Sequence, residues 1–200
     1  FRRESPQKGR FRQFNQINFE NFGSNDPIAD IELINIAYSI LKSLLPNQEL
    51  SLNLNTLGNK GELIEFKNKL TNYFIDKKDK LSDESVEKIN NNPLRILDSK
   101  NQNDLEVSKN APIITEFLSS KSSNYFSEIK NGLKHLNIEF IENTNLVRGL
   151  DYYCHTVFEF KTNSLGSQDT ILGGGRYDGL ISTLGGPDIS GVGWAAGIER

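Results

Sequence analysis

Apolar and polar residues alternate along several stretches of the chain, with the period of two that a half-buried β-strand requires. In residues 14–21 the positions on one face of such a strand are Phe14, Gln16, Asn18 and Glu20. Residues 50–55 alternate leucines with serine and asparagine, and residues 156–161 place Thr156, Phe158 and Phe160 on one face. Two glycine-rich stretches, 168–180 and 191–200, extend the strand pattern towards the end of the chain. The pattern predicts a β-sheet that is built from both ends of the sequence.

Residues 25–46 have the features of an amphipathic helix. Asp26 can cap its first turn, Pro27 fits the first helical position, and Pro46 ends it. We expect one broad apolar face to consist of Ile28, Ile31, Ile36, Ile40, Leu41 and Leu44.

The middle of the chain changes from strand to helix spacing. Leu63, Phe66, Leu70 and Phe74 recur at helical intervals, and residues 90–102 are expected to form a loop. Further apolar positions, which predict two or three more short helices, are Ile114, Phe117, Leu118, Phe126, Ile129, Leu133 and Leu136. The prediction is an α+β fold whose sheet is formed by residues 1–57 and 144–200, with a mostly helical insertion at 58–143.

Composition narrows the class of protein. The chain has 200 residues, 36% hydrophobic and 24% charged, with a net charge of −3, which argues against a surface that coats nucleic acid. Cys154 is the single cysteine, so no internal disulfide can form and a reducing compartment is expected. No apolar run could span a bilayer and no signal peptide opens the chain. The chain lacks methionine, and we expect it to be a piece of a longer protein.

Four arginines are candidate phosphate ligands. Arg2 and Arg10 lie in a basic stretch, residues 1–13, that we expect to form a hairpin or loop between strands, Arg148 precedes two tyrosines, and Arg200 ends the last strand. Guanidinium groups bind phosphate oxygens side-on and stay charged at physiological pH. An isolated arginine is more often an ordinary surface residue, so these four gain meaning only if they converge on one sheet face.

Polar residues on the first predicted strand are candidates for binding a small ligand. Gln16 and Glu20 share a face and could accept from an amino group or an NH-bearing ring, or could simply be exposed. Phe14 on the same face could stack on a base or belong to the core. Cys154, His135 and His155 have no metal-ligand spacing, and we predict no metal site. The stretch GGGRYDGL, residues 173–180, matches neither the P-loop nor the dinucleotide pattern.

Four motifs, in order along the chain, resemble those of histidyl-tRNA synthetases, which are class II aminoacyl-tRNA synthetases. FRRESPQKGRFRQFNQINFENFG at the start resembles the second class II motif, and GVGWAAGIER at the end resembles the third. Between them, LVRGLDYYCHTVFEF and GGGRYDGL resemble the two histidine-specific motifs. The resemblance implies an antiparallel class II catalytic sheet flanked by helices, with an insertion at the place where this chain becomes helical.

The resemblance also implies roles for individual residues. Arg148 and Arg2 would be catalytic, because they would meet the negative charge on the α-phosphate. The histidine pocket would be formed by Gln16, Glu20, Arg148, Tyr152, Tyr153 and Tyr177. ATP would be bound by Arg2, Arg10, Phe14, Glu20 and Arg200.

The implied reaction has two steps and uses no protein nucleophile. The histidine carboxylate attacks ATP to form histidyl-adenylate, and the ribose hydroxyl of tRNA(His) then takes the histidyl group. ATP is a substrate, and Mg²⁺ would bridge its phosphates with few protein ligands. A cytoplasmic homodimer without membrane contact is implied for the full-length protein. Residues 1–200 alone are expected to be weakly active or inactive, since the first class II motif and the anticodon-binding domain lie outside them.

Three departures and three alternatives remain. Ser5, Asn15 and the pair Cys154–His155 differ from residues common in the family, beside the implied contacts and not at them. The alternatives are a non-catalytic paralogue acting as a histidine-sensing regulatory subunit, another class II synthetase, and a tRNA-binding module centred on residues 58–143.

Overall fold

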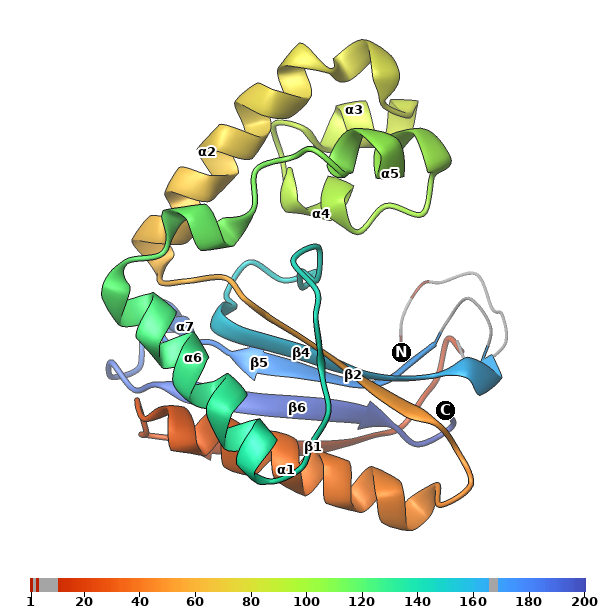
Figure 1. Ribbon diagram of the computed structural model, residues 1–200, viewed down its shortest axis with the longest axis vertical. Helices are drawn as coiled ribbons and strands as arrows, with labels where there is room; N and C mark the ends of the chain where they lie inside the picture. Colours follow the sequence, from red (N-terminus) through yellow and green to blue (C-terminus); the bar gives the residue numbers. More distant parts are fainter. Residues whose placement is uncertain (2, 4–10, 166–168) are drawn as a thin grey trace.

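The computed structural model describes residues 1, 3, 11–165 and 169–200. A six-stranded sheet is its centre (Figure 1), with the strands in the order β1 (Gln16–Phe22), β6 (Gly191–Gly197), β5 (Thr170–Arg176), β4 (Cys154–Thr162), β2 (Leu50–Thr56) and β3 (Ile141–Glu142). Neighbouring strands are antiparallel except β2 and β3, which are parallel. The predicted α+β fold with a mostly antiparallel sheet is confirmed.

Two helices cover one face of the sheet, as Figure 1 shows: α1 (Pro27–Leu44) and α6 (Ser120–His135). The predicted start of α1 is confirmed, because the Asp26 carboxylate accepts a hydrogen bond from the Ile28 amide at 2.8 Å and Pro27 occupies the first turn. The predicted apolar face is correct in part: Leu41 is buried and Ile31 and Ile36 pack against the core, whereas Ile28, Ile40 and Leu44 are exposed. The buried residues of α1 are Ala29, Asp30, Leu33, Ile34, Ala37 and Leu41.

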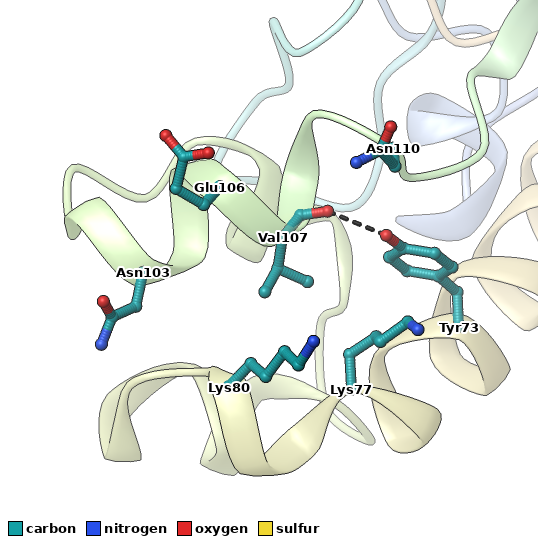
Figure 2. A pocket seen from close by; sticks show the side chains of 7 residues that line it. All are labelled: Tyr73, Lys77, Lys80, Asn103, Glu106, Val107 and Asn110. Atoms are coloured by element: carbon teal, nitrogen blue, oxygen red, sulfur yellow. Dashed lines mark hydrogen bonds between the residues drawn. The ribbon is translucent and has the colours of Figure 1, made fainter.

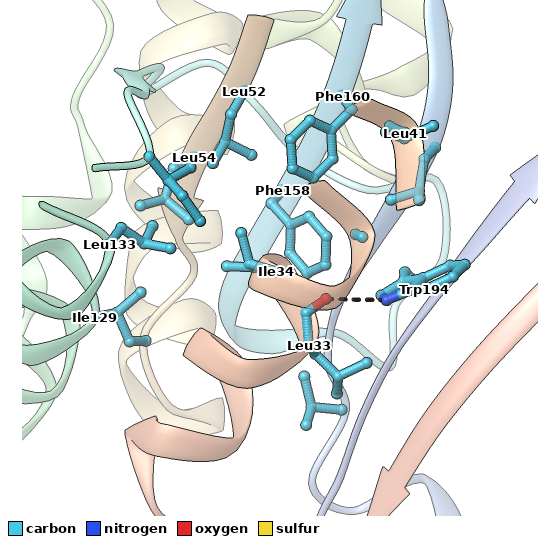
Figure 3. Packing of buried hydrophobic residues seen from close by; sticks show 14 of the residues in the cluster. Leu33, Ile34, Leu41, Leu52, Leu54, Ile129, Leu133, Phe158, Phe160 and Trp194 are labelled. Atoms are coloured by element: carbon cyan, nitrogen blue, oxygen red, sulfur yellow. Dashed lines mark hydrogen bonds between the residues drawn. The ribbon is translucent and has the colours of Figure 1, made fainter. Parts of the chain in front are cut away.

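The main core lies between these helices and the sheet (Figure 3). Leu52 and Leu54 from β2, and Phe158 and Phe160 from β4, meet the helix residues Leu33, Ile34, Leu41, Ile129 and Leu133. Trp194 of β6 closes this core, and its indole N–H donates to the Leu33 carbonyl at 3.1 Å. The core therefore fixes α1 against the strand that carries the third class II-like motif.

A buried ion pair joins α1 to β5 under the same core. Asp30 and Arg176 have side chains that are 0% and 1% exposed, and the Arg176 Nε donates to Asp30 Oδ2 at 3.1 Å. The hydroxyl of Tyr125, on α6, donates to the same carboxylate at 2.9 Å. Burial alone would lower the pKa of Arg176, but the hydrogen bonds and charge of Asp30 raise it above its ordinary value. Asp30 is therefore buried because it neutralises an arginine.

Strand β2 is covered on both faces, and this corrects the expectation of a strand buried on one side. Leu52 and Leu54 face the main core, but Asn53 and Asn55, which alternate with them and lie on the other face, are buried too. The Asn55 amide donates to the carbonyl of Leu146 at 2.9 Å and to that of Thr144 at 3.2 Å. The segment that follows β3 thus lies over the second face, where an asparagine side chain supplies its hydrogen bonds.

The segment between β2 and α6 is helical and forms a second core. Its helices are α2 (Lys60–Asp76), α3 (Asp83–Lys88), α4 (Leu94–Leu97) and α5 (Gln102–Ser108), with 3₁₀ turns η1 (Lys78–Lys80) and η2 (Ile114–Phe117). An Asn59–Glu62 capping box starts α2, whose predicted residues Leu63, Phe66, Leu70 and Phe74 are confirmed as buried. Helix α4 lies where a loop was expected. The remaining short elements are η3 (Asn163–Leu165) and α7 (Leu180–Thr183).

Asp104 holds the small helices of this second core together. Its carboxylate, which is fully buried, accepts hydrogen bonds from the backbone of Ser82 and from the hydroxyls of Ser82, Ser85 and Ser99 at 2.6–2.8 Å. Burial favours a raised pKa, but these hydrogen bonds outweigh it and lower the pKa of Asp104 below its ordinary value. The carboxylate therefore stays charged at neutral pH.

Candidate active site

The face of the sheet opposite α1 and α6 has a floor of very small residues. Residues alternate between faces along a strand, so β6 presents Gly191, Gly193, Ala195 and Gly197 on this face, and β5 presents Gly173 and Gly175. The register places Gly193 between Glu20 of β1 and Gly175 of β5. We call this surface, Gly173, Gly175, Gly191 and Gly193, the glycine floor.

Each glycine of the floor lies under one side chain that the sequence singled out. A Cβ on Gly173 would lie 2.8 Å from the guanidinium nitrogens of Arg148, and one on Gly175 would lie 2.9 Å from the Tyr153 ring. A Cβ on Gly193 would collide with the Glu20 carboxylate, and one on Gly191 with the Tyr177 ring. Because no side chain stands up from these positions, the four functional groups can lie flat against the sheet.

Glu20 and Tyr177 are joined directly. The Tyr177 hydroxyl donates a hydrogen bond to Glu20 Oε2, although the two residues are 157 positions apart. Burial, followed by this hydrogen bond and the charge of Glu20, raises the pKa of Tyr177 above its ordinary value. Tyr177 is therefore a protonated donor at neutral pH, and it holds the carboxylate in place.

Three tyrosine rings form one wall above the floor. The ring centroids of Tyr152 and Tyr153 are 4.7 Å apart, and the Tyr177 ring lies 5.9 Å from Tyr152 and 6.4 Å from Tyr153. Burial and the neighbouring Tyr153 raise the pKa of Tyr152 to about 12. Such a wall offers flat apolar surface with polar tips, which suits a planar polar ring.

Arg148 lies beside the tyrosine wall. Its guanidinium carbon is 5.7 Å from the centre of the Tyr153 ring, and its Nη1 donates to Glu159 Oε1 at 2.5 Å. Its Nε is buried and has no hydrogen-bond partner among the described residues. An arginine held this way can present its remaining N–H groups to a carboxylate or a phosphate.

The segment that carries Arg148 is fixed from two sides. Leu146 and Val147 are buried in the second core, and the Asn55 amide binds the Leu146 carbonyl. On the helical side, Arg95 of α4 donates to the Gly149 carbonyl at 3.1 Å, and Lys67 of α2 pairs with Asp151 at 3.1 Å. The helical segment therefore helps to place the loop that enters the site.

The other predicted site residues lie around this cluster or outside the described residues. Gln16 is exposed on the same face of β1 as Glu20, about 13 Å along the strand. Phe14 is half-buried just before β1. Arg200 follows β6, and its Nη1 donates to the Thr170 carbonyl. Arg2 and Arg10 fall outside the described residues, as does Ser5.

Two residues that sequence reasoning passed over belong to the site. Glu159 of β4 pairs with Arg148, and the Thr170 hydroxyl donates to its other oxygen at 3.0 Å. Glu159 alternates with the buried Phe158 and Phe160, so the strand pattern already placed it on the opposite face. What the pattern did not give was its partner, which lies across a loop.

The departures Cys154 and His155 lie at the entrance to β4. His155 has a positive φ of 46°, and its ring lies 5.1 Å from that of Tyr125. Burial lowers the pKa of His155 and raises that of the Cys154 thiol to about 12. Asn15 binds the Glu199 carboxylate through its backbone at 2.8 Å and its side chain at 2.9 Å. These residues support the frame of the site.

A separate pocket of about 460 Å³ lies in the helical segment between α2, η1 and α5 (Figure 2). It is lined by Tyr73, Lys77, Lys80, Asn103, Glu106, Val107 and Asn110, and the Tyr73 hydroxyl donates to the Val107 carbonyl at 2.9 Å. Its charged and amide side chains are exposed.

Within the described ranges, no three or more His, Cys, Asp or Glu side chains are grouped so as to hold a metal ion. None of the described helices is both long and apolar enough to cross a membrane.

Comparison with known proteins gives a consistent family. The family profile described as histidyl-tRNA synthetase matches residues 1–200. The chain is 48% identical over 200 residues to the histidine–tRNA ligase of Ehrlichia ruminantium (strain Gardel), of which it covers 48%. It is 50% identical over 200 residues to that of Rippkaea orientalis, of which it covers 46%. The chain thus spans about half the length of the curated relatives it matches.

Solved structures agree. The crystal structure of apo S. aureus histidyl-tRNA synthetase matches with a TM-score of 0.73 and 34% identity, over 94% of this chain and 46% of that one. A Bacillus halodurans C protein, described as an ATP phosphoribosyltransferase regulatory subunit/histidyl-tRNA synthetase, matches with a TM-score of 0.60 over 96% of this chain and 54% of that one. At 21% identity the second match is a likeness of fold alone.

Proposed function

Because this chain belongs to the histidyl-tRNA synthetase family, we propose that it forms part of the catalytic domain of a histidine–tRNA ligase. The full-length protein would activate histidine with ATP and transfer it to tRNA(His). The observation that carries this proposal is the convergence of Glu20, Tyr177, Tyr153 and Arg148 on one glycine floor. These groups come from three distant stretches of the chain, and together they offer an acceptor, flat walls and a cation.

In the proposed pocket, a carboxylate and a wall of tyrosine rings would read the imidazole of histidine. Glu20, held by Tyr177, would accept from a ring N–H, while Tyr152 and Tyr153 enclose the ring. A ligand without that N–H would leave the carboxylate with the Tyr177 hydrogen bond alone, and the missing hydrogen bond would cost about 1–3 kcal/mol. Gln16, on the same face, would contact the amino group of the substrate.

The proposed chemistry relies on positioning and on charge. Arg148 would bind the histidine carboxylate and the α-phosphate together, so that the attacking oxygen lies in line with the bond that breaks. Arg2 would share the charge of the α-phosphate. ATP would be held by Arg2, Arg10, Phe14, Glu20 and Arg200.

Further parts of the proposal concern the protein as a whole. Mg²⁺ usually binds nucleotides through their phosphate oxygens with few protein ligands, and would help to neutralise ATP here. We propose that residues 58–143 are an insertion that divides the catalytic core into residues 1–57 and 144–200. The second buried cluster, most of which comes from this range and which Leu57, Leu146, Val147 and Val157 join from the flanking core, supports this division. A cytoplasmic homodimer fits the family.

The runner-up is a regulatory, histidine-sensing paralogue. Its support is the fold likeness to the Bacillus halodurans C protein at 21% identity. The curated relatives at 48–50% identity are named histidine–tRNA ligases, which favours the enzyme.

The test is ATP–pyrophosphate exchange driven by histidine, in the full-length protein. We expect exchange in the wild type and a loss of about 100- to 1,000-fold in Arg148→Ala, the range for removing a group that stabilises transition-state charge. Lys130→Ala is the matched control. It breaks a surface pair between Lys130 of α6 and Glu142 of β3, and it should keep full exchange. Absence of exchange in the wild type would favour the regulatory paralogue.

A further inference from the structure

Glu159 is the only carboxylate bonded to Arg148 in the part of the chain that the structure describes. The two side chains are 21% and 16% exposed, so their contact is largely shielded from solvent. Gly173 lies beneath the guanidinium, with its backbone as the surface on which the group rests. Arg148 is thus held from one side by a charge and from below by the sheet.

The contact leaves one edge of the guanidinium for other uses. Glu159 takes Nη1, whereas Nε and Nη2 lie on the edge that binds an oxyanion with two parallel hydrogen bonds. Nε is already buried, and no acceptor binds it among the residues that the structure describes, which is costly unless a ligand supplies one. The orientation that Glu159 imposes therefore suits a ligand carboxylate or phosphate.

Glu159 is itself anchored. The Thr170 hydroxyl donates to Glu159 Oε2 at 3.0 Å, and Lys161 lies 3.8 Å from the same oxygen. The Thr170 carbonyl accepts from Arg200. A continuous link of Arg148, Glu159, Thr170 and Arg200 therefore joins two arginines that the sequence nominated separately.

We propose that Glu159 is a positioning residue that orients Arg148 for its ligand, with Thr170 fixing Glu159 and relating Arg148 to Arg200. The inference rests on the proposed function for the identity of the ligand. Glu159 acts through Arg148, and the reaction depends on it because a displaced guanidinium no longer meets the charge that forms in the transition state.

The test compares Glu159→Gln, Thr170→Val, Arg148→Lys and the double variant Glu159→Gln/Arg148→Lys in the full-length protein. In histidine-driven exchange, with active sites titrated, we expect Glu159→Gln to lower kcat about 10- to 100-fold and to change KM for ATP and histidine less than about threefold. Thr170→Val should act in the same direction more weakly. The double variant should lose no more than about threefold beyond Arg148→Lys alone, since both changes act on one group.

A second readout does not depend on activity. In protein labelled with ¹⁵N-arginine, the Arg148 Nε–H resonance, identified by its loss in Arg148→Lys, should exchange with water at least about tenfold faster in Glu159→Gln. Glu142→Gln, which removes a carboxylate from a pair with Lys130, is the control and should leave both readouts unchanged.

The inference would be overturned if the losses in kcat of the two single variants multiplied in the double variant. It would also be overturned if the Arg148 Nε–H group exchanged with water no faster in Glu159→Gln than in the wild type. If the wild type shows no ATP–pyrophosphate exchange, but the Nε–H group exchanges with water faster in Glu159→Gln, the proposed function fails and the positioning role stands.

Discussion

Asp30→Asn removes the charge from one half of the buried ion pair beneath the core. Arg176 cannot escape by losing its proton, because its pKa is raised above an already high ordinary value. The variant therefore keeps a guanidinium that is 1% exposed and has lost Asp30, with Asp178, which its Nη1 contacts at 3.0 Å, as the remaining carboxylate. Breaking a buried pair from one side costs about 3–5 kcal/mol of the free energy of unfolding. The weakened hydrogen bond from Tyr125 adds to this loss.

The measurement is a urea titration of the full-length protein, followed by tryptophan fluorescence, to which the buried Trp194 contributes. Glu142→Gln breaks an exposed pair and should cost at most about 1 kcal/mol. Asp30→Leu combined with Arg176→Met removes both charges and should recover most of the loss, because apolar replacements of a buried pair are often neutral. A cost for Asp30→Asn no larger than that of the surface control would refute the argument that this pair is desolvated.

Two further predictions concern the site. Gly193→Ala should push the Glu20 carboxylate away from Tyr177. We expect kcat/KM for histidine in the pyrophosphate-exchange assay to fall about 10- to 100-fold, the equivalent of one hydrogen bond to a charged group. Gly61→Ala in α2 is the control, and equal activity of the two variants would argue against the glycine floor. Burial raises the pKa of the Cys154 thiol to about 12, so the folded thiol keeps its proton until far higher pH. At pH 8 we expect Cys154 to react with a disulfide reagent about 1,000-fold more slowly in the folded protein than in urea. Rates within about tenfold of each other would contradict the burial of the thiol.

Local periodicity was enough to predict the strands and the helix α2. β4 alternates two buried phenylalanines with polar residues, and α2 buries the four apolar residues at helical spacing. Both elements bury residues that are apolar in the ordinary way, so a pattern of residue types finds them.

Periodicity failed where a long-range partner decides what is buried. Asp30 lies inside because Arg176 neutralises it from 146 positions away, so the buried face of α1 includes a charged residue that an apolar pattern leaves out. Asn55 is buried because a later segment supplies carbonyls for its amide. A sequence pattern holds no record of such partners, so these faces were predicted wrongly or incompletely.

The grouping of the site came from resemblance, and its geometry came only from the structure. Similarity to a family brought Glu20, Tyr153, Tyr177 and Arg148 together as candidates. No residue pattern showed that glycines lie beneath them, because a floor is visible only once the register of β1, β6 and β5 is known. The roles of these residues remain proposals.

Helix α6 is continuous in sequence with the helical segment, yet Phe126, Ile129 and Leu133 belong to the core under the sheet. The piece that could be exchanged between relatives without opening that core therefore ends near Ser119, before α6 begins. Its other end lies near Gly58, whose carbonyl accepts from the His155 amide at 2.7 Å. We therefore expect the helical segment to be exchanged or removed most easily at these two points. The second point lies about 24 residues before residue 143, where the return of the strand pattern would place it.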